Sequence, residues 1–330
     1  MRRAWLSPFL VLALVPGWSG DARLPLLGGE ARIDARYLPH LSANPARIRI
    51  GALEYLGGVA LKSPDPAFGG FSALHVAGDR FLLLSDGGGV VRFALGRDWR
   101  IRGASFDELP RGPGTGWEKR DRDSEAIAVD PDTGEYWVAY ESVNAIWRYD
   151  ATLTKSTGAV RPGAMSGWSR SGGPEAMVRL TGGRFIVLSE SAGRGAPSAT
   201  YRAVAFDRDP IEPGARATRF FYRPPSEFRA TAADALPDGR VIVVNRRVAW
   251  PSGFEAVVTI LDPSDIRRDA VVAGREVARF SGDLWSGFGR DNFEAVSVVR
   301  EGDDTIVWLA TDHNMQWPQR SLLLKFRLRE

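Results

Sequence analysis

The chain has 330 residues, of which 44% are hydrophobic and 25% charged, and these values are typical of a folded globular protein and exclude a disordered one. Its formal net charge is +3 and no basic run stands out, so we expect no nucleic-acid partner. The absence of cysteine excludes disulfides, thiolate metal sites and a lipid anchor attached through cysteine.

The N-terminus has the features of an export signal. Arg2 and Arg3 precede an apolar run from Trp5 to Pro16, which is too short to span a bilayer. Small residues follow this run, and we expect cleavage after Ala22. An uncleaved membrane anchor is the alternative.

Residues 1–22 are therefore predicted as a signal peptide and residues 23–330 as a single domain, located in the periplasm or secreted. Removal of the peptide takes away two arginines and one aspartate, which lowers the net charge to +2. No later segment is long and apolar enough to suggest a membrane span after signal cleavage.

A pattern of paired strands recurs along the rest of the chain. A short apolar strand begins with a polar or acidic residue, a turn follows, and a second apolar strand ends in another such residue. The first strands begin, in chain order, at Ser72, Glu125, Glu175, Asp234 and Glu294. The second strands end, in the same order, at Asp86, Glu141, Glu190, Asn245 and Asp312.

The copies start 50 to 60 residues apart, a period that suits one four-stranded antiparallel blade of a β-propeller. Segments between the copies, such as 217–222 and 271–280, can supply fourth strands. The strand-like segment 47–61 precedes the first copy, and we expect it to join the C-terminal strands in a sixth blade, because closure removes a free sheet edge. The predicted fold class is all-β, a propeller of six blades with four antiparallel strands each; five or seven blades are the alternatives.

The repeat predicts a site. Antiparallel pairing brings the start of one strand close to the end of its partner. If the first strand of each copy is innermost, these groups meet at one mouth of the channel. We expect these neighbours to be Ser72 and Asp86, Glu125 and Glu141, Glu175 and Glu190, Asp234 and Asn245, and Glu294 and Asp312.

Carboxylates held so close repel one another unless a cation or an arginine compensates them. Oxygen ligands are those that Ca²⁺ prefers, so we predict a Ca²⁺ site at this mouth, with Mg²⁺ or Mn²⁺ as alternatives. The alternative for each acid is that it caps a turn or pairs with an arginine. The candidate metal ligands are Glu125, Glu175, Asp234, Glu294, Asp86, Glu141, Glu190 and Asp312.

Three further residues are candidates for substrate binding. Arg246 follows Asn245, His313 follows Asp312, and Arg320 lies in the loop after Asp312. A bidentate arginine suits a phosphate or a carboxylate, although pairing with the acids is an equal alternative. For His313 the alternative is a structural or solvated side chain. The three histidines lack the spacing of a zinc protease, and no serine lies in a G-x-S-x-G elbow.

The same repeats carry a family resemblance. They include Asp123-Ser-Glu-Ala-Ile-Ala-Val129, Gly173-Pro-Glu-Ala-Met177, Asp291-Asn-Phe-Glu-Ala-Val296, Gln319-Arg-Ser-Leu-Leu-Leu-Lys-Phe326, and Gly69-Gly-Phe-Ser-Ala-Leu74 with Leu84-Ser-Asp-Gly87. Over residues 50–328 the chain resembles the phytase-like domain family, also described as "esterase-like activity of phytase". The resemblance implies an exported bacterial propeller with a hydrolase label and supplies no catalytic residue. Ser72 departs from the acids of the later copies and leaves the ring open on that side.

Three hypotheses follow. The first is an exported metal-dependent hydrolase of phosphate esters, phytase-like or phosphodiesterase-like, in which the carboxylates hold Ca²⁺ and Arg246 or Arg320 binds the ester. The second is a non-catalytic binding propeller that Ca²⁺ stabilises. The third is a lactonase-like or carboxylesterase-like hydrolase. For the hydrolases the expected partner is a small anionic or ester substrate, and the chain is expected to be a monomer.

Overall fold

A computed structural model describes residues 24–40, 48–193, 195–249, 253–281, 291–312 and 320–329. These residues form 23 β-strands and three short 3-10 helices, η1 (Lys119–Asp121), η2 (Gly163–Met165) and η3 (Pro263–Asp265). Among them, no helix has the length and the hydropathy that crossing a membrane requires. The predicted signal peptide lies outside the described residues.

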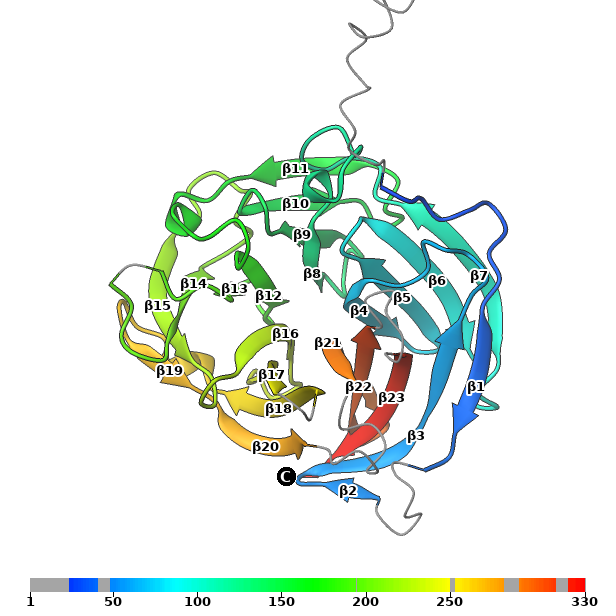
Figure 1. Cartoon of the computed structure of the whole chain (residues 1–330). Helices are drawn as coiled ribbons and strands as arrows, with labels where there is room; N and C mark the ends of the chain where they lie inside the picture. The colour runs from blue at the N-terminus through cyan, green and yellow to red at the C-terminus, as the bar shows by residue number, and fades with distance from the viewer. Residues whose placement is uncertain are drawn as a thin grey trace, which may run out of the picture.

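The strands form five sheets that radiate from a central channel like the blades of a propeller (Figure 1). The innermost strands are β4, β8, β12, β16 and β21, and each contacts the innermost strand of the next blade. All pairings are antiparallel apart from one outer strand of the third blade. The prediction of an all-β propeller is therefore confirmed.

Blade A consists of β4 (Phe71–Ala77), β5 (Arg80–Ser85), β6 (Gly89–Leu95) and β7 (Ile101–Glu108). Blade B consists of β8 (Ser124–Val129), β9 (Tyr136–Tyr140), β10 (Ala145–Tyr149) and β11 (Ser156–Val160). Blade C consists of β12 (Pro174–Arg179), β13 (Phe185–Ser189), β14 (Tyr201–Phe206), β15 (Ala217–Arg223) and β19 (Val271–Ala273). Blade D consists of β16 (Arg229–Ala235), β17 (Val241–Ala249), β18 (Gly253–Leu261) and β20 (Arg275–Phe280). Blade E consists of β21 (Asn292–Glu301), β22 (Asp304–Asp312), β23 (Ser321–Leu328), β3 (Leu53–Lys62) and β1 (Asp34–Leu38), with β2 (Arg49–Ile50) beside β3.

The prediction of six blades is wrong, because the N-terminal strand does not start a blade of its own. The last repeat supplies three strands, and β3 pairs with its third strand in antiparallel register, from Leu53 opposite Leu328 to Leu61 opposite Ser321. The expected pairing of this segment with the C-terminal strands is correct. It completes the fifth sheet instead of building a sixth.

The expected fourth strands of blades C and D are partly correct. Residues 217–222 form most of β15, the fourth strand of blade C. The segment 271–280 divides into two strands. Its first part, β19, pairs in parallel with β15 of blade C, and its second part, β20, is the fourth strand of blade D. This segment therefore connects two neighbouring blades.

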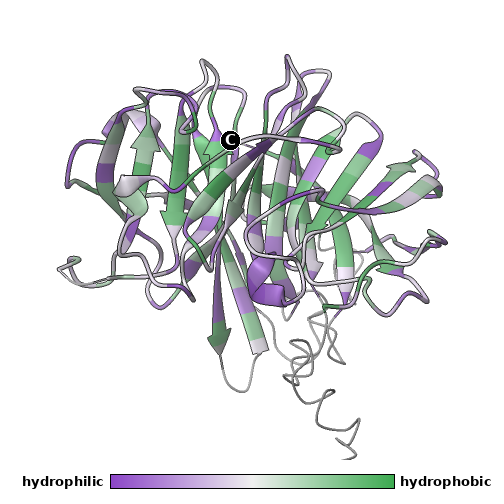
Figure 2. Cartoon of the chain, turned by 90° about the horizontal axis from the view of Figure 1, so that it is seen from above, coloured by the Kyte–Doolittle hydropathy of each residue, from purple (hydrophilic) through white to green (hydrophobic). Residues whose placement is uncertain are grey.

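The core consists of five apolar clusters, one at each of the five contacts between neighbouring blades. Side chains alternate between the two faces of a strand, so Leu83 packs towards blade E while Leu82 and Leu84 pack towards blade B. Both faces of each blade are covered, which explains why runs such as 81–84 and 241–244 are apolar throughout. Figure 2 shows hydrophobic colour along most strands and hydrophilic colour mainly in the connections.

Closure by the N-terminal strand can be tested at Leu53. This side chain is fully buried in the cluster between blades D and E. We expect Leu53→Ala to lower the free energy of unfolding by about 2–5 kcal/mol, because it removes buried methyl groups and leaves a cavity. Urea denaturation measures the change. Val248→Ala, at a side chain that is 73% exposed, is the control and should change stability by less than about 0.5 kcal/mol. Equal effects in the two variants would argue against closure.

Candidate functional site

Each innermost strand begins with a β-bulge, one extra residue that the second strand leaves unpaired. A bulge redirects a side chain, and here it lies at the channel mouth of every blade. Two of the bulged residues carry hydroxyls that donate to the next blade, Ser72 to the Ser124 carbonyl at 2.6 Å and Thr231 to the Phe293 carbonyl at 3.1 Å. In blades A to E, the bulged residues are Ser72, Glu125, Glu175, Thr231 and Glu294.

A second set of polar residues lies at the mouth end of the second strand of each blade, within the strand in blades D and E and directly after it in the other three. In blades D and E the ladder itself pairs Arg246 with Arg229 and Asp312 with Asn292. In the other three blades the backbone N–H of this residue donates to the carbonyl of the residue directly before the inner strand, which is Gly70, Asp123 or Gly173. The five residues, in blade order, are Asp86, Glu141, Glu190, Arg246 and Asp312. Four acids and one arginine therefore line the mouth beside the bulges.

Blade D corrects the predicted alignment of the fourth repeat. Asp234 pairs with Ile242, not with Asn245, and lies three residues beyond the bulged Thr231. Its two carboxylate oxygens accept the backbone N–H groups of Ala235 and Val298. Thr231 and Asp234 are each followed by an alanine, so the sequence pattern does not distinguish them. The strand register shows that Thr231 is the bulged residue. Asp234 therefore lies away from the carboxylates, and burial raises its pKa to about 6.

The expected role of Asn245 at the mouth is also wrong. Asn245 is buried within blade D, where it donates to the carbonyl of Val257 at 3.1 Å and accepts from the hydroxyl of Tyr222 at 2.8 Å. Arg246 occupies the position that the repeat assigned to Asn245. The change matters, because it places a cation among the acids.

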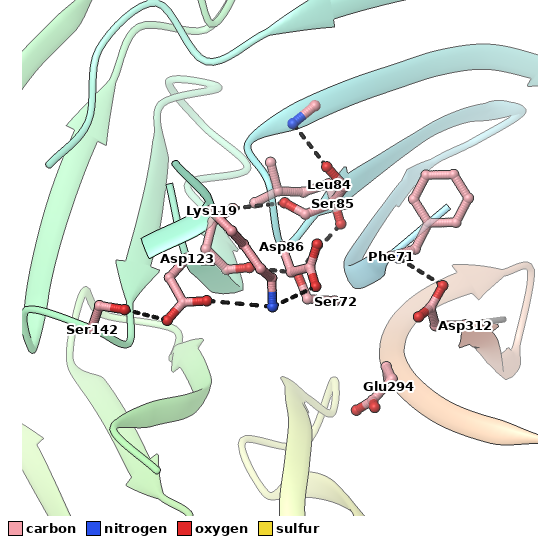
Figure 3. A network of polar contacts seen from close by, with 12 residues as sticks. Phe71, Ser72, Leu84, Ser85, Asp86, Lys119, Asp123, Ser142, Glu294 and Asp312 are labelled. Carbon is pink, nitrogen blue, oxygen red and sulfur yellow. Dashed lines mark hydrogen bonds and ion pairs between the residues drawn. The ribbon is translucent and has the colours of Figure 1, made fainter. Parts of the chain in front are cut away.

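Asp123, Glu125 and Glu141 form a tight group of acids among the described residues. One oxygen of each carboxylate lies within 4.8 Å of the others. Glu125 and Glu141 thus lie together as the repeat predicted. Asp123, 8% exposed, was missed by the sequence reasoning, although it lies directly before β8 and only two residues before Glu125. It accepts a hydrogen bond from Ser142, as Figure 3 shows.

Burial and mutual repulsion disfavour ionisation in this group. Burial, and then the charges of Asp123 and Asp86, raise the pKa of Glu125 well above its usual range. Burial likewise raises the pKa of Glu175, with further contributions from Glu125 and from a hydrogen bond to Glu141. A hydrogen bond between two carboxyls requires a proton on one of them, so an approaching cation can replace that proton.

Lys119, from η1, is a cation that the repeat could not predict. Its Nζ lies 2.8 Å from Oδ2 of Asp86 and 3.6 Å from Oδ1 of Asp123 (Figure 3). Burial opposes its charge, but Asp86 and the nearby acids raise its pKa above the ordinary value. Burial also raises the pKa of Asp86, and Lys119 opposes that shift.

Arg246 lies on the other side of the mouth. It donates to Glu294 and, at 2.6 Å, to Oδ1 of Asn292, and its Nη2 is 3.9 Å from Oε1 of Glu190. Arg229 is 3.5 Å from the same oxygen of Glu190. Despite Arg246, burial raises the pKa of Glu294 to about 7. The mouth therefore has an acidic side on blades B and C and an arginine-containing side on blades D and E.

The remaining predicted residues have structural contacts or lie outside the described chain. Oδ1 of Asp312 accepts the backbone N–H of Phe71 at 3.1 Å, which joins blade E to blade A. Arg320 forms a bidentate pair with the buried Asp291, at 2.7 and 3.2 Å. His313 lies outside the described residues. Asp312 and Arg320 thus help to hold the mouth together, and their predicted metal-binding and substrate-binding roles stay predictions.

The model of one protein family, phytase-like, described as "Esterase-like activity of phytase", matches residues 66–315, most of the chain. The chain belongs to the phytase-like family. The resemblance predicted from the repeats is therefore confirmed, and the carboxylate mouth is a feature of a phytase-like propeller. No curated protein matches the chain.

Solved structures show similarity at low sequence identity. The α-L-arabinofuranosidase of Podospora anserina, in complex with cellotriose, has 13% identity and a TM-score of 0.51, over 84% of this chain and 97% of that one. A putative exported protein of Bacteroides fragilis has 10% identity and a TM-score of 0.42, over 84% and 96%. The hydrazine synthase of Kuenenia stuttgartiensis has 13% identity and a TM-score of 0.38, over 73% of this chain and 76% of that one. At 13% identity, the similarity to the arabinofuranosidase supports the fold alone.

The raised pKa of Glu294 predicts a pH dependence of stability. Its pKa is about 7 in the folded chain against an ordinary 4.5, so between these values the folded state binds more protons than the unfolded one. Without divalent cations, the stability of wild type relative to Glu294→Gln should fall as the pH rises from about 4.5 to 7. Urea denaturation in chelator at several pH values measures this. A difference that does not change with pH would contradict it.

Proposed function

We propose that this phytase-like propeller is an exported, metal-dependent hydrolase of phosphate esters that acts at its carboxylate mouth. The observation that carries the proposal is the group of Asp123, Glu125 and Glu141, whose oxygens lie within 4.8 Å of one another. The family description, which names an esterase-like activity, agrees with hydrolysis. Export rests on the signal peptide predicted over residues 1–22.

The donor set fits a hard divalent cation. Ca²⁺ binds oxygens at about 2.3–2.6 Å, so two oxygens on one ion lie at most about 5 Å apart. The three carboxylates meet this condition, and Glu175 is hydrogen-bonded to one of them. Because carboxylates with raised pKa values lose their mutual repulsion when a cation binds, the site favours an occupant with a double positive charge. Mg²⁺ and Mn²⁺ are the other oxygen-preferring candidates.

The side chains around this group can orient a phosphate ester. When bound, the cation would supply electrostatic stabilisation of the phosphoryl oxygens and of an attacking water. Lys119 on one side, and Arg229 with Arg246 on the other, would neutralise the charge of the substrate. Glu294 has a pKa near 7 and a side chain that is 18% exposed, which suits it to accept or deliver a proton at the mouth.

Calcium binding can be tested without any substrate. We expect saturating Ca²⁺, at about one hundred times its dissociation constant, to stabilise the protein by about 2.7 kcal/mol. Glu125→Gln should abolish this gain, because it removes one of the three clustered carboxylates. Asp132→Asn, at the opposite mouth of the channel, is the matched control and should keep it. Thermal unfolding with and without Ca²⁺ measures the shift. An equal gain in Glu125→Gln and wild type would contradict the assignment of the ligand.

Turnover requires a separate experiment. We expect Ca²⁺-dependent hydrolysis of p-nitrophenyl phosphate or bis(p-nitrophenyl) phosphate, with kcat/KM reduced at least about a hundredfold in Glu125→Gln, since metal stabilisation contributes several kcal/mol. Asp132→Asn should retain the wild-type rate. Hydrolysis of carboxyl esters or lactones alone would replace the proposal with the carboxylesterase-like hypothesis. Calcium-dependent stability with no turnover of any ester would favour the non-catalytic binding propeller.

A further inference from the structure

A cavity of about 320 Å³ adjoins the mouth on the side of blade A. Asp86 and Lys119, which belong to the mouth, lie in its lining. One wall is the N-terminal segment 24–27, which consists of three leucines and a proline. The opposite surface is formed by glycine-rich turns of blade A. The cavity is thus largely apolar, with a charged edge that consists of Asp86, Glu108 and Lys119.

The segment 24–27 is fixed at both ends. The backbone N–H of Leu24 donates to the Trp117 carbonyl at 2.7 Å, and that of Gly28 donates to Asp65. Leu27 packs against the core cluster between blades E and A. Leu24 and Leu26 line the cavity and are only partly buried. They therefore present apolar surface that the described part of the chain leaves partly exposed.

Glycine keeps the cavity open on the side of blade A. A Cβ added at Gly87 would lie 3.2 Å from Cδ1 of Leu24, so a larger side chain there must push Leu24 aside and extend into the cavity that both residues line. The backbone of Gly87 lies outside the region with positive φ, and other residues can adopt it. Gly87 is therefore a position at which the cavity can be filled without backbone strain.

We infer that this cavity binds the apolar alcohol part of the substrate, so that the preferred substrates are phosphate esters of small hydrophobic alcohols. The inference rests on the proposed function, which brings the phosphate to the mouth. Lys119 offers a positive charge at the junction, and Leu24 and Leu26 offer apolar surface beyond it. The volume lies at the lower end of the range for small-molecule sites. A strongly polar alcohol such as an inositol polyphosphate would leave the cavity unfilled.

Non-hydrolysable alkylphosphonates test the inference independently of turnover. Calorimetry with methyl-, ethyl-, propyl- and butylphosphonate, with Ca²⁺ present, should show affinity rising about fourfold for each added methylene, the ratio expected for its burial. Gly87→Leu should remove this dependence by filling the cavity. Leu26→Ser, which removes apolar surface without filling the space, should weaken it. Gly163→Leu is the matched control, because Gly163 has no atoms close to an added Cβ and lies outside the cavity.

The outcomes separate the inference from the proposed function. An affinity independent of chain length, or a dependence that survives in Gly87→Leu, would overturn the inference, even if phosphate esters are hydrolysed. A dependence on chain length that Gly87→Leu abolishes would support it. If the wild-type protein shows this dependence but hydrolyses no phosphate ester, the proposed function fails while the apolar binding site stands. Thermal unfolding of each variant confirms that its fold is intact.

Discussion

The hydrogen bonds between β3 and β23 hold the ring of five blades closed, and the geometry of the mouth depends on that closure. Each blade has two apolar faces, and a blade that lacked a neighbour on one side would expose one of them to water. The pairing also fixes blade E against blade A, where Asp312 accepts the backbone N–H of Phe71. The positions of the bulged residues relative to one another follow from this ring.

The bulges convert that ring into a site. In a regular ladder, side chains alternate between the two faces of each blade, and both faces pack against apolar side chains of neighbouring blades. One extra residue at the start of each inner strand releases a polar side chain from this alternation. In three blades that residue is a glutamate, and in two it is a hydroxyl that joins neighbouring blades. The site is therefore asymmetric although the architecture repeats.

The sequence contained enough information for the propeller and for most of the acids, because strand periodicity and turn chemistry act locally. It misplaced the fourth repeat, since Thr231 and Asp234 both precede an alanine and only pairing with β17 separates them. It also predicted one blade too many, although it paired the N-terminal strand with the C-terminal strands correctly, because local pattern does not show that this strand completes the sheet of the fifth repeat. Lys119 has no counterpart in the other copies, so no repeat could indicate it. Asp123 could have been found as an acid that directly precedes the inner strand, beside the predicted Glu125.

The N-terminal part of the chain has two structural roles. Residues 24–27 form a wall of the cavity beside the mouth, and residues 53–62 complete the blade that the C-terminus begins. The contact that closes the ring joins segments far apart in the sequence, since Glu54 in β3 and Arg329 directly after β23 are separated by 275 residues. Slow closure of such a distant contact is expected from topology. Until β3 and β23 pair, the chain therefore has blades but no finished mouth.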